Sequence, residues 1–278
     1  MISDKETNTI YFSELVATNI LFKDTFANIA SILKSFGVEH KFIPDTKDIW
    51  ARDYMPIQVN ETKYIEYRYD PDYLQGHRKG CRDLKTYPDI VCNSLKLATE
   101  KSDLILDGGN IVKSSDSIIL VDKIVYENRL SYSKKELIVK LLDTFQVDKV
   151  VLIPWFTREK YGHSDGLVRF IDNKTVLLNY FYKNDTEMLN RLKTCGLKAE
   201  FIDFKVKKQD KRNWAYLNFL QTIDMIIIPK FDIDEDYQAF EQMENYFYDY
   251  KGRISQVDMT EIVKFGGALN CITWTTKE

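Results

Sequence analysis

The stretch Phe265-Gly266-Gly267-Ala268-Leu269-Asn270-Cys271-Ile272-Thr273-Trp274 places a single cysteine after two glycines and at the start of an apolar run. A cysteine acts as a nucleophile in its thiolate form, so it needs a neighbouring cation or base that lowers its pKa, and glycines let backbone or substrate approach closely. A buried cysteine that packs as a small hydrophobic residue is the more common case. The stretch therefore predicts a nucleophile, provided that other parts of the sequence supply its partners.

A histidine is the expected partner of such a cysteine. The sequence contains three, His40, His77 and His163. Only His163 lies in a turn-like setting, Gly162-His163-Ser164-Asp165-Gly166, with a carboxylate two residues further on. Cys271 and His163 are therefore the candidate catalytic pair, and a loop histidine with a purely structural hydrogen bond is the alternative for His163.

Composition describes an ordinary globular protein. The 278 residues are 44% hydrophobic and carry a formal net charge of -3, and their number allows one large domain or two small ones. No basic patch of the kind that nucleic acid requires is visible. Neither a signal peptide nor an apolar run of about eighteen residues occurs, so we expect a cytoplasmic protein that contacts no membrane.

The cysteines indicate neither a zinc site nor a disulfide framework. They are scattered and have no C-x-x-C spacing, at Cys81, Cys92, Cys195 and Cys271. Cys195 falls on the apolar face of a predicted helix, so we interpret it as structural, and Cys81 and Cys92 have no partner motif. We expect no metal.

A helix, a strand, a loop with unusual residues and a second strand recur along the sequence. Apolar residues at helical spacing predict helices over residues 22–36, 137–145, 188–195 and 240–247, with a weaker one over 90–99. Strands are predicted after them at 38–44, 149–155, 197–204, 253–259 and 103–106. Second strands follow the loops at 118–121, 175–181, 225–231 and 271–275.

The loops between these strands recur at a regular interval. Equivalent positions lie about 50 to 56 residues apart, at Asp53, Gly108, His163, Asn213 and Leu269. No unit of this size can bury its apolar face alone, so the five units must close on one another. Closure brings the loops to one end of a central axis and gathers Asp53, Asp107, His163, Asp165 and Cys271. The sequence thus predicts a closed ring of five α/β repeats about a central axis, with pseudo-fivefold symmetry.

Five motifs in a single order carry a family resemblance. They are D-I-W-A-R-D-Y-M-P (48–56), L-D-G-G-N-I (106–111), G-H-S-D-G (162–166), Y-L-N-F (216–219) and G-G-A-L-N-C-I-T (266–273). The sequence resembles agmatine deiminases and their relatives, the Porphyromonas-type peptidyl-arginine deiminases, over residues 45–275. That family has the pentein fold, a five-bladed α/β propeller. The resemblance implies a single catalytic domain over residues 1–278 and no cofactor.

The resemblance also implies roles for the gathered residues. A guanidinium is planar and permanently cationic, so carboxylates must hold it in a fixed geometry. Asp53 and Asp165 are expected to bind it, Cys271 to attack its carbon, and His163 to act first as acid and then as base. Asp107 stands where the family usually has glutamate and is expected to orient His163 or to touch the substrate.

The expected substrate-binding set is completed by Trp50, Arg52, Asn110 and Gly267. Structural alternatives exist for several of these residues. Asp53 could be an ion-pair partner of Arg52, and Asp107-Gly108 is also a hairpin-turn sequence. Trp50 and Trp214 could line the site, although an aromatic residue near a sheet more often belongs to the core.

The implied reaction is the conversion of agmatine and water to N-carbamoylputrescine and ammonia, a step toward putrescine in polyamine biosynthesis. Peptidyl arginine or another arginine derivative is the alternative substrate. Noncatalytic binding proteins of pentein fold, such as the ribosome anti-association factor, lack the cysteine, histidine and aspartate set that this sequence has. The partner is expected to be a small guanidine, and a homodimer is possible.

The sequence departs from the family at Met55, Gly166 and Asn270. The segment Tyr64-Ile65-Glu66-Tyr67-Arg68-Tyr69-Asp70 replaces the family's substrate loop. Acidic residues in and after this segment, Glu66, Asp70 and Asp72, are expected near the mouth of the site. They favour a substrate with a cationic or neutral tail over free arginine.

Overall fold

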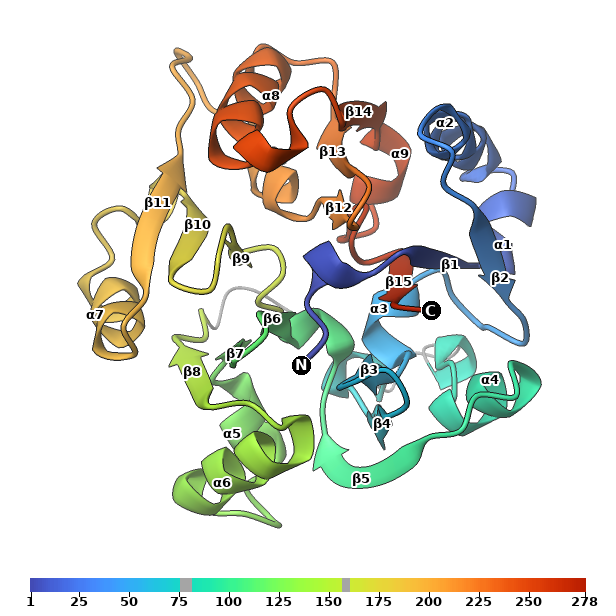
Figure 1. Cartoon of the computed structure of the whole chain (residues 1–278), viewed down its shortest axis with the longest axis vertical. Helices are drawn as coiled ribbons and strands as arrows, with labels where there is room; N and C mark the ends of the chain where they lie inside the picture. Colours follow the sequence, from blue (N-terminus) through green and yellow to red (C-terminus); the bar gives the residue numbers. More distant parts are fainter. Residues whose placement is uncertain (76–81, 157–160) are drawn as a thin grey trace.

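Five three-stranded sheets surround a common axis in the computed structural model, which describes residues 1–75, 82–156 and 161–278 (Figure 1). In each sheet the inner strand pairs antiparallel with the middle strand, and the middle strand pairs parallel with the outer strand. Helices connect the middle strand to the outer strand. This β-β-α-β order confirms the predicted five-bladed α/β propeller.

We number the blades in chain order, each with its strands from the axis outward. Blade 1 has β15 (Thr273–Thr276), β1 (Thr9–Ser13) and β2 (His40–Ile43), with helices α1 (Glu14–Thr18) and α2 (Lys23–Ser35). Blade 2 has β3 (Ile57–Gln58), β4 (Tyr64–Arg68), β5 (Glu100–Ile105) and α4 (Pro88–Ser94). Blade 3 has β6 (Val112–Lys113), β7 (Ser117–Val121), β8 (Lys149–Ile153), α5 (Lys123–Glu127) and α6 (Lys134–Phe145).

Blade 4 has β9 (Val168–Phe170), β10 (Thr175–Asn179), β11 (Lys198–Ile202) and α7 (Thr186–Thr194), and blade 5 has β12 (Leu220–Gln221), β13 (Ile226–Lys230), β14 (Ile254–Asp258) and α8 (Glu235–Tyr246). Two short helices stand in loops, α3 (Ala51–Tyr54) and α9 (Thr260–Val263). Single 3-10 turns are η1 (Asp4–Glu6), η2 (Asp72–Leu74), η3 (Arg82–Leu84), η4 (Gly108–Asn110), η5 (Tyr180–Tyr182), η6 (Asn213–Leu217) and η7 (Tyr248–Tyr250).

Blade 1 closes the ring with strands from both ends of the sequence. β15 pairs antiparallel with β1, with Trp274 opposite Tyr11, and β1 pairs parallel with β2. The indole N–H of Trp274 donates to the carbonyl of Pro56, 2.8 Å away, at the start of blade 2. Ring closure therefore sets the position of the residues just before β15.

The longer helices form where the sequence predicts them, because their caps and apolar faces agree, whereas α1 and α5 were not predicted. α6 begins with the expected capping box between Ser133 and Glu136, and its apolar side chains Leu137 and Leu141 are completely buried. α2 buries Ile29 and Leu33 and ends shortly before Gly37, whose φ of 70° suits glycine. These helices cover the outsides of the blades.

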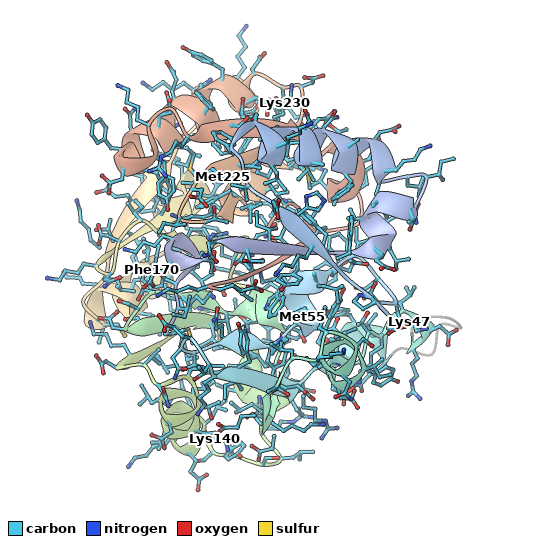
Figure 2. All side chains as sticks on the ribbon, turned by 45° about the vertical axis from the view of Figure 1, so that its right-hand side comes forward. Lys47, Met55, Lys140, Phe170, Met225 and Lys230 are labelled. Carbon is cyan, nitrogen blue, oxygen red and sulfur yellow. The ribbon has the colours of Figure 1, made fainter. Side chains whose placement is uncertain are left out.

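The apolar core lies between neighbouring blades, and side chains fill the molecule on all sides of the inner strands (Figure 2). The inner strands nevertheless bring buried polar side chains to the axis. These are Gln58, Lys113, Arg169, Gln221 and Thr275, one from each blade. The axis is therefore polar while the spaces between blades are apolar.

Several boundaries differ from the predictions. The last strand starts at Thr273, so Cys271 lies in the turn before it and not in the strand. Residues 64–68 form strand β4, so the segment predicted as a replaced substrate loop is mostly a strand. Strand β5 begins three residues earlier than predicted, because pairing with β4 extends it. His77 and Cys81 lie outside the described residues.

Within the described part of the chain, no helix is long and apolar enough to cross a bilayer.

Candidate active site

Loops that enter the inner strands meet at one end of the axis and enclose a cavity of about 270 Å³. Its walls come from distant parts of the sequence: Asp48, Trp50, Asp53, Tyr69, Tyr73, Leu74, Leu84, Tyr161, His163, Phe265, Gly266, Gly267 and Cys271. An adjoining cavity of about 360 Å³ shares His163 and Cys271 and adds Asp165 and Trp214. The fold thus brings the predicted pair, Cys271 and His163, into one space.

The turn that holds Cys271 is fixed from two sides. Its carbonyl accepts a hydrogen bond of 3.0 Å from the backbone N–H of Arg52, and its own N–H donates to Oδ1 of Asn218 at 3.2 Å. The side-chain amide of Asn218 lies 3.2 Å from Sγ, and Oδ2 of Asp165 lies 3.5 Å from Sγ. The thiol therefore has a defined position beside a carboxylate.

Asn218 was missed as a site residue by the sequence analysis. It follows η6 in the fourth of the five equivalent loops, within the motif Y-L-N-F. The signal was therefore its place in the repeat, since each of the other four loops also supplies a residue to the site.

His163 lies between two carboxylates. Its Nε2 is 3.1 Å from Oδ2 of Asp107, and its Nδ1 is 3.7 Å from Oδ1 of Asp53. Burial disfavours the charged imidazole, but the charge of Asp53 and the hydrogen bond to Asp107 outweigh it and raise the pKa of His163 to about 10. The imidazole is therefore protonated at neutral pH and can serve as an acid.

Gly109 lets these groups approach one another. A Cβ at this position would lie 2.5 Å from Nδ1 of His163 and 2.6 Å from Oδ1 of Asp53. Its N–H donates to Asp53 at 3.1 Å, and its carbonyl accepts the backbone N–H of Asp165, also at 3.1 Å. The second glycine of L-D-G-G-N-I is needed for this close packing.

Three buried carboxylates surround the thiol and the imidazole. Burial, together with Asp107 and Asp165, raises the pKa of Asp53 to about 8 despite the opposing charge of His163. Asp165 accepts a hydrogen bond of 2.7 Å from the amide of Asn270, and Asp107 accepts one of 3.1 Å from the hydroxyl of Tyr73. A group of acids this dense is stabilised by a bound cation.

Trp50 and Gly267 line the cavity as predicted. A Cβ at Gly267 would lie 2.3 Å from the ring of Trp50, so the glycine leaves space for the indole. Trp214 lines the adjoining cavity, and both indoles also pack on the apolar core. Each of the two tryptophans therefore both packs on the core and lines a cavity.

Arg52 and Asn110 do not line either cavity, and their contact with the substrate stays a prediction. The side chain of Arg52 is 5% exposed and points toward the axis, where its Nε donates to the carbonyl of Asn270 at 3.4 Å. The side chain of Asn110 exchanges hydrogen bonds with the backbone of Val121 and joins η4 to β7. Both residues support the site without facing it.

The acidic residues expected at the mouth also have other partners. Glu66 accepts the hydroxyl of Thr99 and faces Lys101. The other two pair in the same way, Asp70 with Arg68 and Lys85, and Asp72 with Lys123. Alternation along β4 turns Glu66 away from the cavity, and each of the three carboxylates is paired with at least one cation.

Asp48 supplies an acidic group in their place and was missed, although it opens the motif D-I-W-A-R-D. It lines the cavity, and its Oδ1 accepts the N–H of Trp50 at 2.9 Å. Burial raises the pKa of Asp48 to about 7. The sequence shows that residue 48 is acidic, but it does not show that this side chain lines the cavity.

The remaining candidates for metal or thiol chemistry lie elsewhere. Over the described ranges, no group of three His, Cys, Asp or Glu side chains has an arrangement that could hold a metal ion. His40 packs against the rings of Phe12, Phe26 and Phe42, and burial lowers its pKa. Cys92 and Cys195 are free thiols outside the cavity.

A five-bladed α/β propeller with a cysteine, a histidine and carboxylates in one axial cavity defines the guanidine-modifying enzymes of pentein fold. Solved structures agree on the fold. The agmatine deiminase of C. jejuni matches 100% of this chain and 95% of its own with a TM-score of 0.77 at 18% identity. DDAH from Pseudomonas aeruginosa matches 98% of this chain and 100% of its own with a TM-score of 0.58 at 12% identity.

The chain belongs to the Porphyromonas-type peptidyl-arginine deiminase family, whose model matches residues 7–276. Members of this family are hydrolases that act on guanidino C–N bonds. An Enterococcus faecalis protein that carries the provisional name agmatine deiminase is 27% identical over 212 residues, which span 62% of this chain and 57% of that relative. The family resemblance seen in the five sequence motifs is confirmed.

Proposed function

We propose that this chain deiminates a small guanidine, with agmatine as the best substrate, through a covalent intermediate on Cys271. The observation that supports the proposal most is that Cys271 and His163 share a cavity with Asp53, and that Asp165 lies 3.5 Å from the sulfur. A structural relative has been solved as a C. jejuni agmatine deiminase with substrate bound. The coarser statement, a deiminase of an arginine-derived guanidine, follows from family membership.

Substrate binding and thiol activation are linked. Burial, Asp165 and Asp53 raise the pKa of the Cys271 thiol well above its usual range. A guanidinium bound between Asp53 and Asp165 would neutralise the carboxylates that disfavour a second negative charge on Cys271. The pKa of the thiol would then fall, so the thiolate forms most readily when the cation is present. The resting enzyme would therefore hold an unreactive thiol.

The reaction then proceeds in two halves. The Cys271 thiolate attacks the guanidine carbon, and the tetrahedral species expels ammonia after His163 has given a proton to the departing nitrogen. This leaves an amidino-thioether on Cys271. His163, now neutral, takes a proton from a water that attacks the same carbon. The hydroxyl proton of the adduct then passes to solvent as the C–S bond breaks, which releases the ureido product and the thiolate.

The cavity walls favour a tail without a negative charge. The described residues that line the 270 Å³ cavity include the carboxyl group of Asp48 and three tyrosines, but no lysine or arginine. Agmatine carries an ammonium at its far end, which Asp48 can neutralise. The carboxylate of free arginine would meet no lysine or arginine among these walls, and the protonated His163 is already paired with Asp53 and Asp107. Peptidyl arginine, whose tail is neutral, is the alternative substrate.

The test is a comparison of ammonia release from agmatine, free arginine and a blocked arginine amide, with wild type and with Asp48→Asn. We expect kcat/KM to be highest for agmatine, and we expect Asp48→Asn to reduce it about tenfold for agmatine but little for the blocked amide, because only agmatine has a second cation. High salt should lower the ratio of kcat/KM for agmatine to kcat/KM for free arginine. Free arginine as the best substrate would contradict the assignment.

The plot of kcat/KM against pH should be bell-shaped, with its maximum at alkaline pH. Asp53, with a pKa of about 8, is protonated below that pH and then cannot pair with the guanidinium. His163, with a pKa of about 10, keeps its proton below that pH and loses it above, so it can then no longer donate a proton to the departing nitrogen. We expect kcat/KM to rise through about pH 8 and to fall above about pH 10. A rate that keeps rising beyond this range would exclude His163 as the acid.

A further inference from the structure

Residues 2–8 lie near the centre of the ring (Figure 1), and their contacts reach all five blades. The N–H of Ile2 donates to the carbonyl of Val59 in blade 2, and the carbonyl of Thr7 accepts from Ile223 in blade 5. The N–H of Asn8 donates to Thr276 in blade 1. Since Val59 and Ile223 follow the inner strands, whose other ends carry the site loops, this segment closes the opposite end of the axis.

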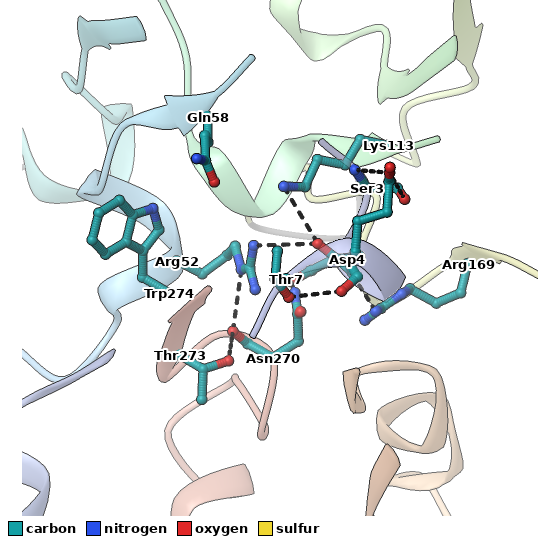
Figure 3. A network of polar contacts seen from close by, with 12 residues as sticks. Ser3, Asp4, Thr7, Arg52, Gln58, Lys113, Arg169, Asn270, Thr273 and Trp274 are labelled. Carbon is teal, nitrogen blue, oxygen red and sulfur yellow. Dashed lines mark hydrogen bonds and ion pairs between the residues drawn. The ribbon is translucent and has the colours of Figure 1, made fainter. Parts of the chain in front are cut away.

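Asp4 brings one carboxylate to three buried cations from three blades (Figure 3). Its oxygens lie 3.1 Å from Nη2 of Arg169, 3.5 Å from Nζ of Lys113 and 3.9 Å from Nη1 of Arg52. The side chains of these cations are 3%, 4% and 5% exposed, so water does little to screen them. Loss of the carboxylate would leave them to repel one another.

One of these cations contacts the backbone of the turn that holds the nucleophile. The guanidinium Nε of Arg52 donates to the carbonyl of Asn270, and its backbone N–H donates to the carbonyl of Cys271. The side-chain amide of Asn270 in turn donates to Asp165 at 2.7 Å. A continuous set of contacts therefore runs from Asp4 through Arg52 to the turn that holds the thiol and its neighbouring carboxylate.

We propose that Asp4 is a positioning residue for the reaction: it holds Arg52 against the Asn270-Cys271 turn and so fixes Cys271 and Asp165 for attack. The inference rests on the proposed function of Cys271. It also identifies the pocket between Arg52, Lys113 and Arg169 as a site for a small carboxylate, which Asp4 occupies in the native chain and which formate can occupy when that side chain is removed.

The experiment compares Asp4→Ala with Glu6→Ala in the full chain. Glu6 is a matched control because its carboxylate caps the same turn through Ser3 but touches none of the three cations. Two rates are measured, ammonia release from agmatine and modification of Cys271 by 2-chloroacetamidine, followed by intact mass. Each is measured with sodium formate and with sodium chloride at equal ionic strength.

We expect Asp4→Ala to lower kcat and the modification rate at least about tenfold, with KM changed less than about threefold, because misplacement of a reacting group acts on the chemical step. Formate should restore a large part of both rates in Asp4→Ala, while chloride should not. Both rates of Glu6→Ala should stay within about twofold of wild type, and formate should not change them. Near-ultraviolet circular dichroism checks that each variant is folded.

Two results would overturn the proposal. One is a folded Asp4→Ala with wild-type rates, and the other is a loss of rate that formate does not repair and that follows the folded fraction. If Asp4→Ala does not fold, Arg52→Lys takes its place, because it keeps the charge but removes the Nε donor; unchanged rates there would also overturn it. Failure of wild type to release ammonia would count against the proposed function alone, since the modification rates still test the role of Asp4.

Discussion

Replacing Cys271 with alanine should abolish ammonia release and leave the propeller intact. Among the described residues that line the cavity, Cys271 is the one thiol, so we expect kcat to fall by at least about three orders of magnitude. Cys271 is 6% exposed, and the loss of its small side chain removes the contacts of Sγ with Asn218, Asp165 and the backbone of Ala268. Thermal unfolding should therefore change little, and intact mass should show no adduct with 2-chloroacetamidine.

Cys195→Ala is the matched control for this experiment. Cys195 is a free thiol at the end of α7, away from the cavity, and burial raises its pKa. We expect this variant to keep full activity and still to form the adduct on Cys271. Retained turnover in Cys271→Ala would disprove the covalent mechanism, whatever the substrate.

The second large effect concerns the two carboxylates that are expected to hold the guanidinium. Asp53→Asn and Asp165→Asn keep the shape of the side chain but remove a buried charge, which leaves the substrate cation incompletely paired. Losing one partner of a buried ion pair costs about 3–5 kcal/mol, so kcat/KM for agmatine should fall by at least about two orders of magnitude. Steady-state kinetics with agmatine measures this fall.

Asp70→Asn is the control for charge alone. Asp70 pairs with Arg68 and Lys85 outside the cavity, so its replacement should change kcat/KM less than about threefold. Full activity in Asp53→Asn would show that the guanidinium does not depend on this carboxylate. Equal losses in Asp53→Asn and Asp70→Asn would point to net charge of the protein instead of a specific contact.

The sequence was sufficient to predict the blades and the convergence of the loops, because both follow from a repeat. Each unit has the same alternation of helix and strand, and the spacing from Asp53 to Cys271 places one special residue in successive units. Closure of the ring then leaves one arrangement in which these residues meet. The contacts between His163, Asp53 and Asp107 are consistent with that expectation.

The direction of individual side chains could not be predicted in the same way. Arg52 and Asp53 are adjacent, yet Asp53 faces the cavity and Arg52 faces the axis, because α3 turns successive side chains by about 100°. Glu66 lies in a strand that alternates its faces, and its outward direction depended on pairing with β5. The partner of Arg52, Asp4, is 48 residues away in sequence, and no local pattern indicated that they would meet.

The position of Cys271 immediately before β15 has a consequence for how the protein is made. A ribosome synthesises the nucleophile only after the residues of blades 2 to 5 have been joined, and the turn that orients it forms when β15 pairs with β1, more than 260 residues earlier in the sequence. Contacts between such distant residues are late events in folding. A chain that lacks β15 therefore has neither a closed ring nor an oriented thiol. Pairing of β15 with β1 closes the ring and positions the nucleophile in the same step.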